Sequence, residues 1–205
     1  MARKRDDAGK CMDAALSLAA IGGWNNLTLY DIARETKLEI GDVVSAIGSR
    51  HGALAILAER ADQAMLGAVD EEWDDESRRD RLFTLLMARF DFLRDRREGI
   101  RAVMAGLPGD PGTALRLLSG SGVRSMRLTL EAAGIPTGGV RGAIRIRALG
   151  AAYAAIMRTF LDDDSEDLSR TMAAVDRRLN GLENMAGRLK FRAGRKGTEK
   201  AAEPA

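Results

Sequence analysis

The sequence of 205 residues predicts an all-α protein, and three observations support this prediction. Apolar residues recur at spacings of three and four through most of the chain, as they do along one side of an amphipathic helix. Good helix formers, namely Ala, Leu, Arg and Met, dominate the middle of the chain, and the whole sequence contains only four prolines. No segment alternates apolar and polar residues with the period of a strand.

The N-terminal residues predict a flexible basic arm followed by a first helix. The arm spans residues 1–9. Its basic residues are Arg3, Lys4 and Arg5. Helical spacing begins near Met12, and the segment GGWNN at residues 22–26 ends the helix.

Three further helices are expected before residue 70, each with a recognisable start or end. Thr28 and Asp31 form a T-x-x-D capping box, because the hydroxyl and the carboxylate can accept from free N–H groups at a helix start. A short helix over residues 41–48 follows. Ser49 is then placed to cap a longer helix that ends near Leu66. These helices and the first one make up a predicted N-terminal domain.

The polar segment DEEWDDESRRD at residues 70–80 predicts the boundary between two domains, residues 10–69 and residues 70–190. Helical spacing resumes at Arg81. One apolar side of the new helix consists of Leu82, Leu85, Leu86, Phe90 and Leu93. The loop GLPGDPG at residues 106–112 follows, and then a broken or paired helix that GIPTGG ends at residues 134–139.

Two long helices are expected at the end of the second domain. The first runs from about Val140 to Leu161. The second starts within the acidic segment 162–167, where Ser165 is a suitable N-cap and the acids complement the helix dipole. Its apolar residues follow a heptad-like spacing: Leu168, Met172, Val175, Leu179, Leu182, Met185 and Leu189. Residues 191–205 are expected to form a disordered basic tail.

The composition argues against several classes of protein. The single cysteine, Cys11, excludes an internal disulfide, and no apolar run approaches the roughly 18 residues of a membrane span, so we expect a soluble cytoplasmic protein. One histidine and one cysteine argue against a histidine-based catalytic triad or a His/Cys metal site, so we expect no enzyme activity, cofactor or metal. The acids at 162–164 can in principle hold a divalent cation, although an acidic helix start is the plainer interpretation.

The second and third helices have the spacing of a helix-turn-helix. Ile32, Leu38, Val43 and Ile47 can form a small shared core. The side that meets DNA in such motifs then carries Asp42, Val44, Ser45 and Ala46. The segment 39–47 contains two acids and no Lys or Arg, which is unusual for a helix that reads DNA.

The segment CMDAALSLAAIGGWNNLTLYDIARETKLEIGDVVSAIGSRHGAL resembles the N-terminal domain of TetR-type transcriptional regulators. The resemblance covers about the first 65 residues, including an aromatic residue after the glycines and a Ser-Arg pair where the family has Ser-Lys. It implies a TetR-like fold and a double-stranded DNA operator as partner. The expected DNA-binding residues are Arg3, Lys4, Arg5, Thr28, Glu39, Asp42, Ser45 and Arg50.

These residues have different expected roles. Thr28 and Arg50 would contact phosphates, Glu39 or Asp42 can accept from cytosine N4, and Ser45 can pair with several base edges. Val44 stands where the family has an aromatic residue that often touches a phosphate. Since acids near phosphates weaken binding, the positive charge must come from the arm and from Arg50. The alternative is that the exposed acids merely solvate a helix.

A second resemblance rests on the segments DRLFTLLMARFDFLRDRREGIRAVM and RTFLDDDSEDLSRTMAAVDRRL. It covers roughly residues 80–182, which are similar to a TetR-fold lipid-binding family that assists ubiquinone biosynthesis. It implies isoprenoid or other lipid binding without a need for DNA. Both resemblances imply an apolar cavity in the C-terminal helices for a small apolar effector or a lipid. Its expected lining is Met87, Phe90, Met104, Met126, Tyr153 and Met157, with Met suited to an adaptable pocket. The alternative is that these are ordinary core residues.

The last two helices are expected to form a homodimer as a four-helix bundle, with intramolecular packing as the alternative. Small residues that allow close helix approach are Ala148, Gly150, Ala151, Ala152 and Ala155. The first functional hypothesis is a ligand-responsive DNA-binding repressor. The alternative hypothesis is a lipid-binding protein that does not bind DNA. In that alternative, the basic end makes peripheral contact with an anionic membrane through Arg188, Lys190, Arg192, Arg195 and Lys196.

Overall fold

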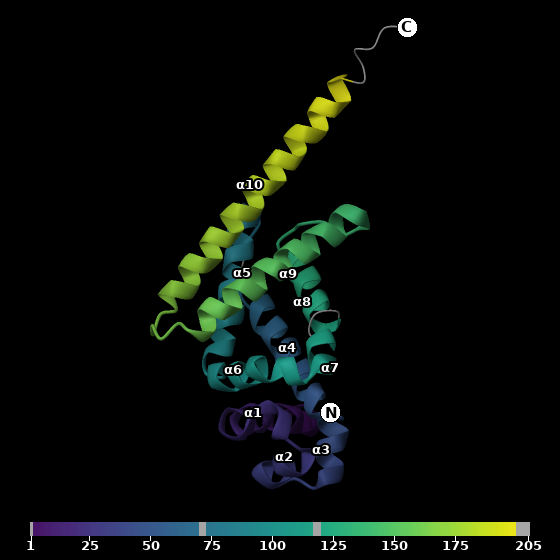
Figure 1. Ribbon diagram of the computed structural model, residues 1–205, viewed down its shortest axis with the longest axis vertical. Coiled ribbons are helices and arrows are strands. Elements are labelled where there is room, and N and C mark those ends of the chain that lie inside the picture. The colour runs from purple at the N-terminus through teal and green to yellow at the C-terminus, as the bar shows by residue number, and fades with distance from the viewer. Residues whose placement is uncertain (1, 70–72, 117–119, 200–205) are drawn as a thin grey trace.

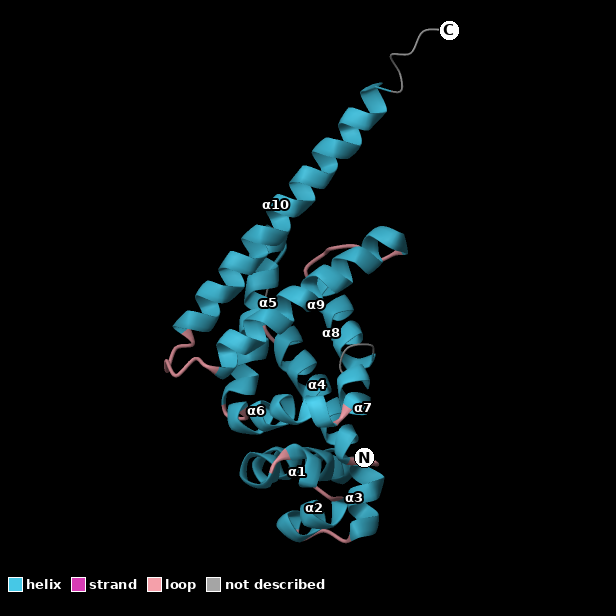
Figure 2. Cartoon of the chain, viewed as in Figure 1, coloured by secondary structure: helices cyan, strands magenta, loops and turns pink. Residues whose placement is uncertain are grey.

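The computed structural model describes the backbone of residues 2–69, 73–116 and 120–199, and the side chains of residues 6–69, 73, 75–115 and 120–184. Within these ranges the chain is helical and contains no strand, which confirms the predicted all-α class (Figures 1 and 2). The helices form two groups along the long axis of the molecule, and α4 runs from one group into the other (Figure 1).

The N-terminal group consists of α1 (Ala2–Gly22), η1 (Trp24–Asn26), α2 (Leu29–Thr36), α3 (Ile40–Ile47) and the start of α4 (Arg50–Leu66). The C-terminal group consists of η2 (Trp73–Asp75), α5 (Arg78–Arg94), α6 (Arg97–Gly106), η3 (Leu107–Gly109), α7 (Pro111–Arg116), α8 (Gly122–Ala132), α9 (Gly139–Leu161) and α10 (Ser169–Glu199). The predicted paired helix is thus α7 and α8, with residues 117–119 between them outside the described ranges.

The caps at the starts of α2 and α4 are those that the sequence predicts. The Thr28 hydroxyl accepts from the Asp31 N–H at 3.2 Å, and the Asp31 carboxylate accepts from the Thr28 N–H at 3.0 Å. The Ser49 hydroxyl accepts from the Gly52 N–H at 3.3 Å. These side chains satisfy N–H groups that the helix itself leaves free, and they fix where each helix begins.

The buried core follows the predicted apolar sides. Ile32, Val43 and Ile47 are buried in the N-terminal group, and Leu38 packs against them half-buried. The predicted side of α5 is buried at all five positions: Leu82, Leu85, Leu86, Phe90 and Leu93. Helix α4 packs against α1 and α3 at one end and against α5 and α8 further along. A movement of α4 therefore affects both groups.

The two ends of the chain correct the predicted boundaries. Helix α1 begins at Ala2, so residues 2–9, predicted as a flexible arm, are helical. Gly9, a weak helix former, does not interrupt the helix, and Lys10 pairs with Asp6 one turn earlier at 2.7 Å. Helix α10 runs to Glu199, so residues 191–199, predicted as disordered, are helical as well. Residues 200–205 lie outside the described ranges.

Helix α10 begins at Ser169, seven residues after the point where the acidic segment starts. Ser165 accepts from the Ser169 N–H at 3.0 Å, so it caps the helix from outside rather than as its adjacent residue. Buried Asp163 accepts from the N–H and the hydroxyl of Thr171, both at 2.7 Å. Burial opposes the charged carboxylate, but hydrogen bonds from Ser165 and Thr171 outweigh it and lower the pKa of Asp163 to about 2.

We expect the Asp163→Asn variant to be less stable than the wild type by about 2 kcal/mol at pH 7. The folded pKa of Asp163 lies below the unfolded value of about 3.9, so the carboxylate stabilises the fold above pH 4 and loses this contribution as the pH falls toward 2. Urea unfolding followed by circular dichroism at pH 7 and pH 3 measures the difference. The gap between variant and wild type should narrow at pH 3, and an equal gap at both values would contradict the assignment.

The heptad-like residues of α10 pack largely within the chain. Leu168, Val175 and Leu179 are buried where α10 lies on α9 and α5, whereas Met172 is 42% exposed. The side chains of Met185 and Leu189 lie outside the described residues. The C-terminal part of α10 extends past the other helices (Figure 1). Within the described ranges, neither α9, α10 nor any other helix has the length and apolarity needed to cross a membrane.

Helices α1 and α6 approach closely at Gly99, where a β-carbon would lie 2.6 Å from the backbone oxygen of Leu16. We expect Gly99→Ala to reduce the free energy of unfolding by roughly 1–3 kcal/mol, because backbone atoms must move apart to admit the methyl group. Gly150→Ala on α9 is the matched control, since its β-carbon would meet only Met126 Cγ at 3.8 Å. Thermal unfolding of both variants checks this, and equal melting temperatures would show that α1 and α6 separate freely.

Candidate nucleic-acid interface and effector core

The helix-turn-helix lies at one end of the molecule, and its outer side is open. Val43 and Ile47 of α3 point into the core. Four predicted contacts are exposed on the outer side: Thr28, Glu39, Asp42 and Ser45. Helices α2 and α3 lie at the opposite end of the molecule from the C-terminus of α10 (Figure 1). The structure therefore leaves these four side chains accessible to a large partner.

Exposed residues outside the expected DNA-binding set lie on the same helices. Tyr30 is 62% exposed, Ile40 is 51% exposed and Val44 is 47% exposed. Arg34 and Lys37 are exposed cations, and Lys37 ends α2 in the left-handed conformation with φ of 56°. These positions could have been predicted from the helical spacing. Residues on the side of each helix opposite to the buried Ile32 and Val43 must face outward.

Arg50, the predicted phosphate contact at the start of α4, is held inside the molecule. Its guanidinium donates to the carbonyl of Trp24 at 3.2 Å, to the carbonyl of Asn25 at 3.0 Å and to Asp110 Oδ2 at 2.8 Å. It also lies 5.5 Å from the centre of the Trp24 ring. Only 24% of the Arg50 side chain is exposed. The side chains of Arg3, Lys4 and Arg5 lie outside the described residues.

Asp110 joins the C-terminal group to the start of α4. Its carboxylate accepts from the hydroxyl of Thr113 at 2.7 Å and from the Thr113 N–H at 3.0 Å, and it lies 3.3 Å from His51 Nε2. The hydrogen bonds from Thr113, with a smaller contribution from His51, hold the pKa of Asp110 well below its usual range. Asn25 adds a further link by donating to the Gly106 carbonyl at 3.1 Å.

We call this set of contacts the latch, and its members are Trp24, Asn25, Arg50, His51 and Asp110. The latch connects η1 and the start of α4 with the residue just before α7. The start of α4 directly follows the helix-turn-helix and packs against α3. A displacement of Asp110 would therefore act on the N-terminal group directly.

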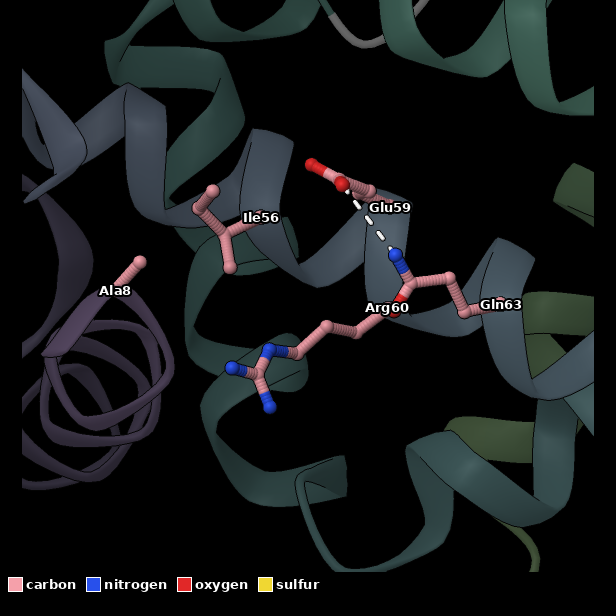
Figure 3. Close-up of a pocket in the computed structure, with 5 residues that line it drawn as sticks. All are labelled: Ala8, Ile56, Glu59, Arg60 and Gln63. Carbon is pink, nitrogen blue, oxygen red and sulfur yellow. Dashed lines mark hydrogen bonds between the residues drawn. The ribbon is translucent and has the colours of Figure 1, made fainter. Parts of the chain in front are cut away.

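The predicted effector-lining residues belong to the packed core. Phe90, Met126 and Met157 are buried, while Met87, Met104 and Tyr153 are half-buried against the same core. The Phe90 ring stacks on Tyr153 with centroids 5.3 Å apart. A cavity of about 260 Å³ lies elsewhere, between α1 and α4, and Figure 3 shows the Arg60 side chain extending across it. Its lining consists of Ala8, Ile56, Glu59, Arg60 and Gln63.

A buried polar cluster, which the sequence analysis missed, lies beside these residues. Arg89 of α5 pairs with Asp62 of α4 and donates to the Tyr153 hydroxyl of α9 at 3.1 Å. Ser125 of α8 donates to the other Asp62 oxygen at 2.9 Å. Burial opposes the charge of Arg89, but Tyr153 and Asp62 outweigh it and raise the pKa of the guanidinium. Both charged side chains are at most 7% exposed, so four helices meet around an ion pair shielded from water.

Comparisons with known proteins show which solved structures share this architecture. No protein-family model matches the sequence, and no curated protein matches it. The structure is similar to a TetR transcriptional regulator from Nitrosomonas europaea ATCC 19718, with a TM-score of 0.67 and 23% identity over 86% of this chain and 95% of that one. A TetR regulator from Rhodococcus sp. RHA1 gives a TM-score of 0.60 and 18% identity over 88% of this chain and 96% of that one.

A third structure, the TetR family regulator PfmR from Thermus thermophilus, gives a TM-score of 0.51 and 16% identity over 84% of this chain and 98% of that one. At these identities the likeness establishes the fold, so the predicted TetR-like fold is confirmed across most of the chain. All three structures are of regulators. The comparisons do not support the second resemblance, to the lipid-binding family of ubiquinone biosynthesis.

Proposed function

We propose that this protein is a ligand-responsive, DNA-binding transcriptional regulator of the TetR type. The observation that carries the proposal is the open outer side of α3 on a helix-turn-helix that α4 joins to a second helical group. The partner is a double-stranded DNA operator, with the α3 side in the major groove. Arg3, Lys4 and Arg5 of the N-terminal segment, together with exposed Arg34 and Lys37, supply the positive charge that α3 lacks.

The proposed regulator acts as a homodimer through α9 and α10. Exposed apolar side chains support this surface: Val140 at 79%, Ile144 at 53% and Met172 at 42%. Ala151 is exposed nearby and Gly150 is half-buried, so a second helix can approach closely. Two helix-turn-helix motifs in one dimer match two half-sites on DNA.

A small apolar effector would bind among the predicted lining residues of the C-terminal core and change the spacing of the two heads. Such an effector must bind one arrangement more tightly than the other, because only differential affinity shifts a conformational equilibrium. The latch is a suitable connection, since Asp110 belongs to the C-terminal group and Arg50 to the helix that carries the N-terminal one.

The test is a DNA titration with the full chain. Duplexes are selected from a random pool, and binding is measured by fluorescence anisotropy at two salt concentrations. We expect affinity to fall steeply with salt, because each neutralised phosphate contributes a slope of about −0.9 to log K against log salt. The Arg3→Glu/Arg5→Glu variant should lose binding, and Arg127→Glu, a charge reversal at an exposed position of α8, should retain it. Full binding by the first variant would refute a DNA-contacting role for residues 3–5.

A further inference from the structure

Two apolar side chains on the outer side of α3 have no role in the contacts described so far. Ile40 and Val44 are four residues apart, so they are neighbours along one side of the helix. About half of each is exposed, at 51% and 47%. Gly41, which lies between them in sequence, is exposed as well, and no atom beyond its chain neighbours and the adjacent backbone of α3 lies within 4 Å of the position that its β-carbon would take. The helix therefore presents an apolar pair beside a point where a partner can approach its backbone.

The chemistry of these side chains limits what they can recognise. Ile and Val carry no hydrogen-bond donor or acceptor, so they can contribute only apolar contact. In the major groove, the apolar feature on a base edge is the C5-methyl group of thymine. A helix that enters the groove with Ile40 and Val44 on its outer side can therefore distinguish thymine through this methyl group.

The acids on the same helix can accept from the amino group of the same base pair. Carboxylates accept hydrogen bonds only, so Glu39 and Asp42 are repelled by the O6 and N7 acceptors of guanine. Adenine, the partner of thymine, offers its N6 amino group as a donor in the major groove. Cytosine also offers an amino group, at N4, but its base pair carries no methyl group. A single A·T pair therefore presents both a methyl group for the apolar pair and an amino group for an acid.

We propose that Ile40 and Val44 are specificity-determining residues that contact thymine methyl groups in the operator. This inference rests on the proposed function, because it requires α3 to enter the major groove. In this proposal, α3 recognises bases through contacts with thymine methyl groups, and Glu39 and Asp42 accept hydrogen bonds from base amino groups. Residues outside α3 bind the phosphates.

Replacement of thymine by deoxyuridine tests the proposal, since uracil keeps the pairing and the hydrogen-bonding edge of thymine and lacks only the methyl group. Each thymine of a selected duplex is replaced in turn, and the affinity of the full chain is measured by anisotropy. We expect the affinity to fall about fourfold at each contacted methyl, the effect of removing one buried methylene-sized group. Val44→Ala or Ile40→Ala should abolish the response at one position each, while Val69→Ala, at a 41% exposed position after α4, should leave every response unchanged.

The outcomes separate this inference from the proposed function. Failure to enrich any duplex would overturn the proposed function itself. If a duplex is enriched but its affinity does not change when thymine is replaced by deoxyuridine, the proposed methyl contacts are overturned and the proposed function is not. If both alanine variants kept the wild-type response to deoxyuridine, the proposed methyl contacts would also be overturned. Ile40 and Val44 would then be candidates for contact with a protein partner. Since both side chains are half exposed, the variants should keep the wild-type melting temperature, which verifies that they are folded.

Discussion

The Asp62→Ala variant is expected to lose about 3–5 kcal/mol of unfolding free energy. Removal of the carboxylate leaves the Arg89 guanidinium charged and buried, with the neutral groups of Tyr153 and Ser125 as its remaining partners. An uncompensated charge away from water is far more unfavourable than the loss of one contact. Urea unfolding followed by circular dichroism at pH 7 measures the change.

The double variant Asp62→Leu/Arg89→Met is the control for this interpretation. It removes both charges and fills their space with apolar side chains, a replacement that is often neutral or stabilising for buried ion pairs. We therefore expect the double variant to be clearly more stable than Asp62→Ala. If both variants were equally unstable, the loss would come from packing around α4 and α5 rather than from the unpaired charge.

The parts of this fold that could be predicted from sequence are those that local chemistry determines. The capping box at Thr28 and Asp31 and the cap at Ser49 involve residues three positions apart, so their pattern is visible in the sequence. The break between α5 and α6 is different. It falls at Asp95 and Arg96, where no Gly or Pro marks a helix end, and it follows from the packing of α6 against α1.

The contacts that define the candidate site were harder to predict, because they join residues far apart in the chain. The outward side of α3 follows from the spacing of its core residues. In contrast, Arg50 and Asp110 are sixty positions apart, and nothing in the sequence around Arg50 indicates which carboxylate it meets. Asp62 and Arg89 stand on the apolar, buried sides of α4 and α5, and a charge at such a position was the one signal available for the buried cluster.

We expect Asp110→Asn to increase the affinity for operator DNA severalfold. The asparagine side chain can still accept from Thr113 and preserve the turn before α7, but it lacks the charge that holds the Arg50 guanidinium. Released Arg50 can then bind a phosphate, as the residue at this position was predicted to do. The slope of log K against log salt should become steeper by about 0.9 for each added phosphate contact. Anisotropy titrations over a range of salt concentrations measure both quantities.

The Arg50→Ala/Asp110→Asn double variant decides whether Arg50 carries this gain. If it does, the added affinity and the added slope both disappear in the double variant, and their persistence would assign the effect to a different change in α4. Under the proposed function, Asp110 and DNA compete for one guanidinium in the wild type. An effector that displaces Asp110 from Arg50 would then favour DNA binding, and one that tightens the contact would oppose it. Because coupling between two binding sites is reciprocal, operator DNA must change effector affinity by the same factor. The factor by which operator DNA changes effector affinity should be smaller in Asp110→Asn, because this variant lacks the Asp110–Arg50 ion pair that couples the two sites.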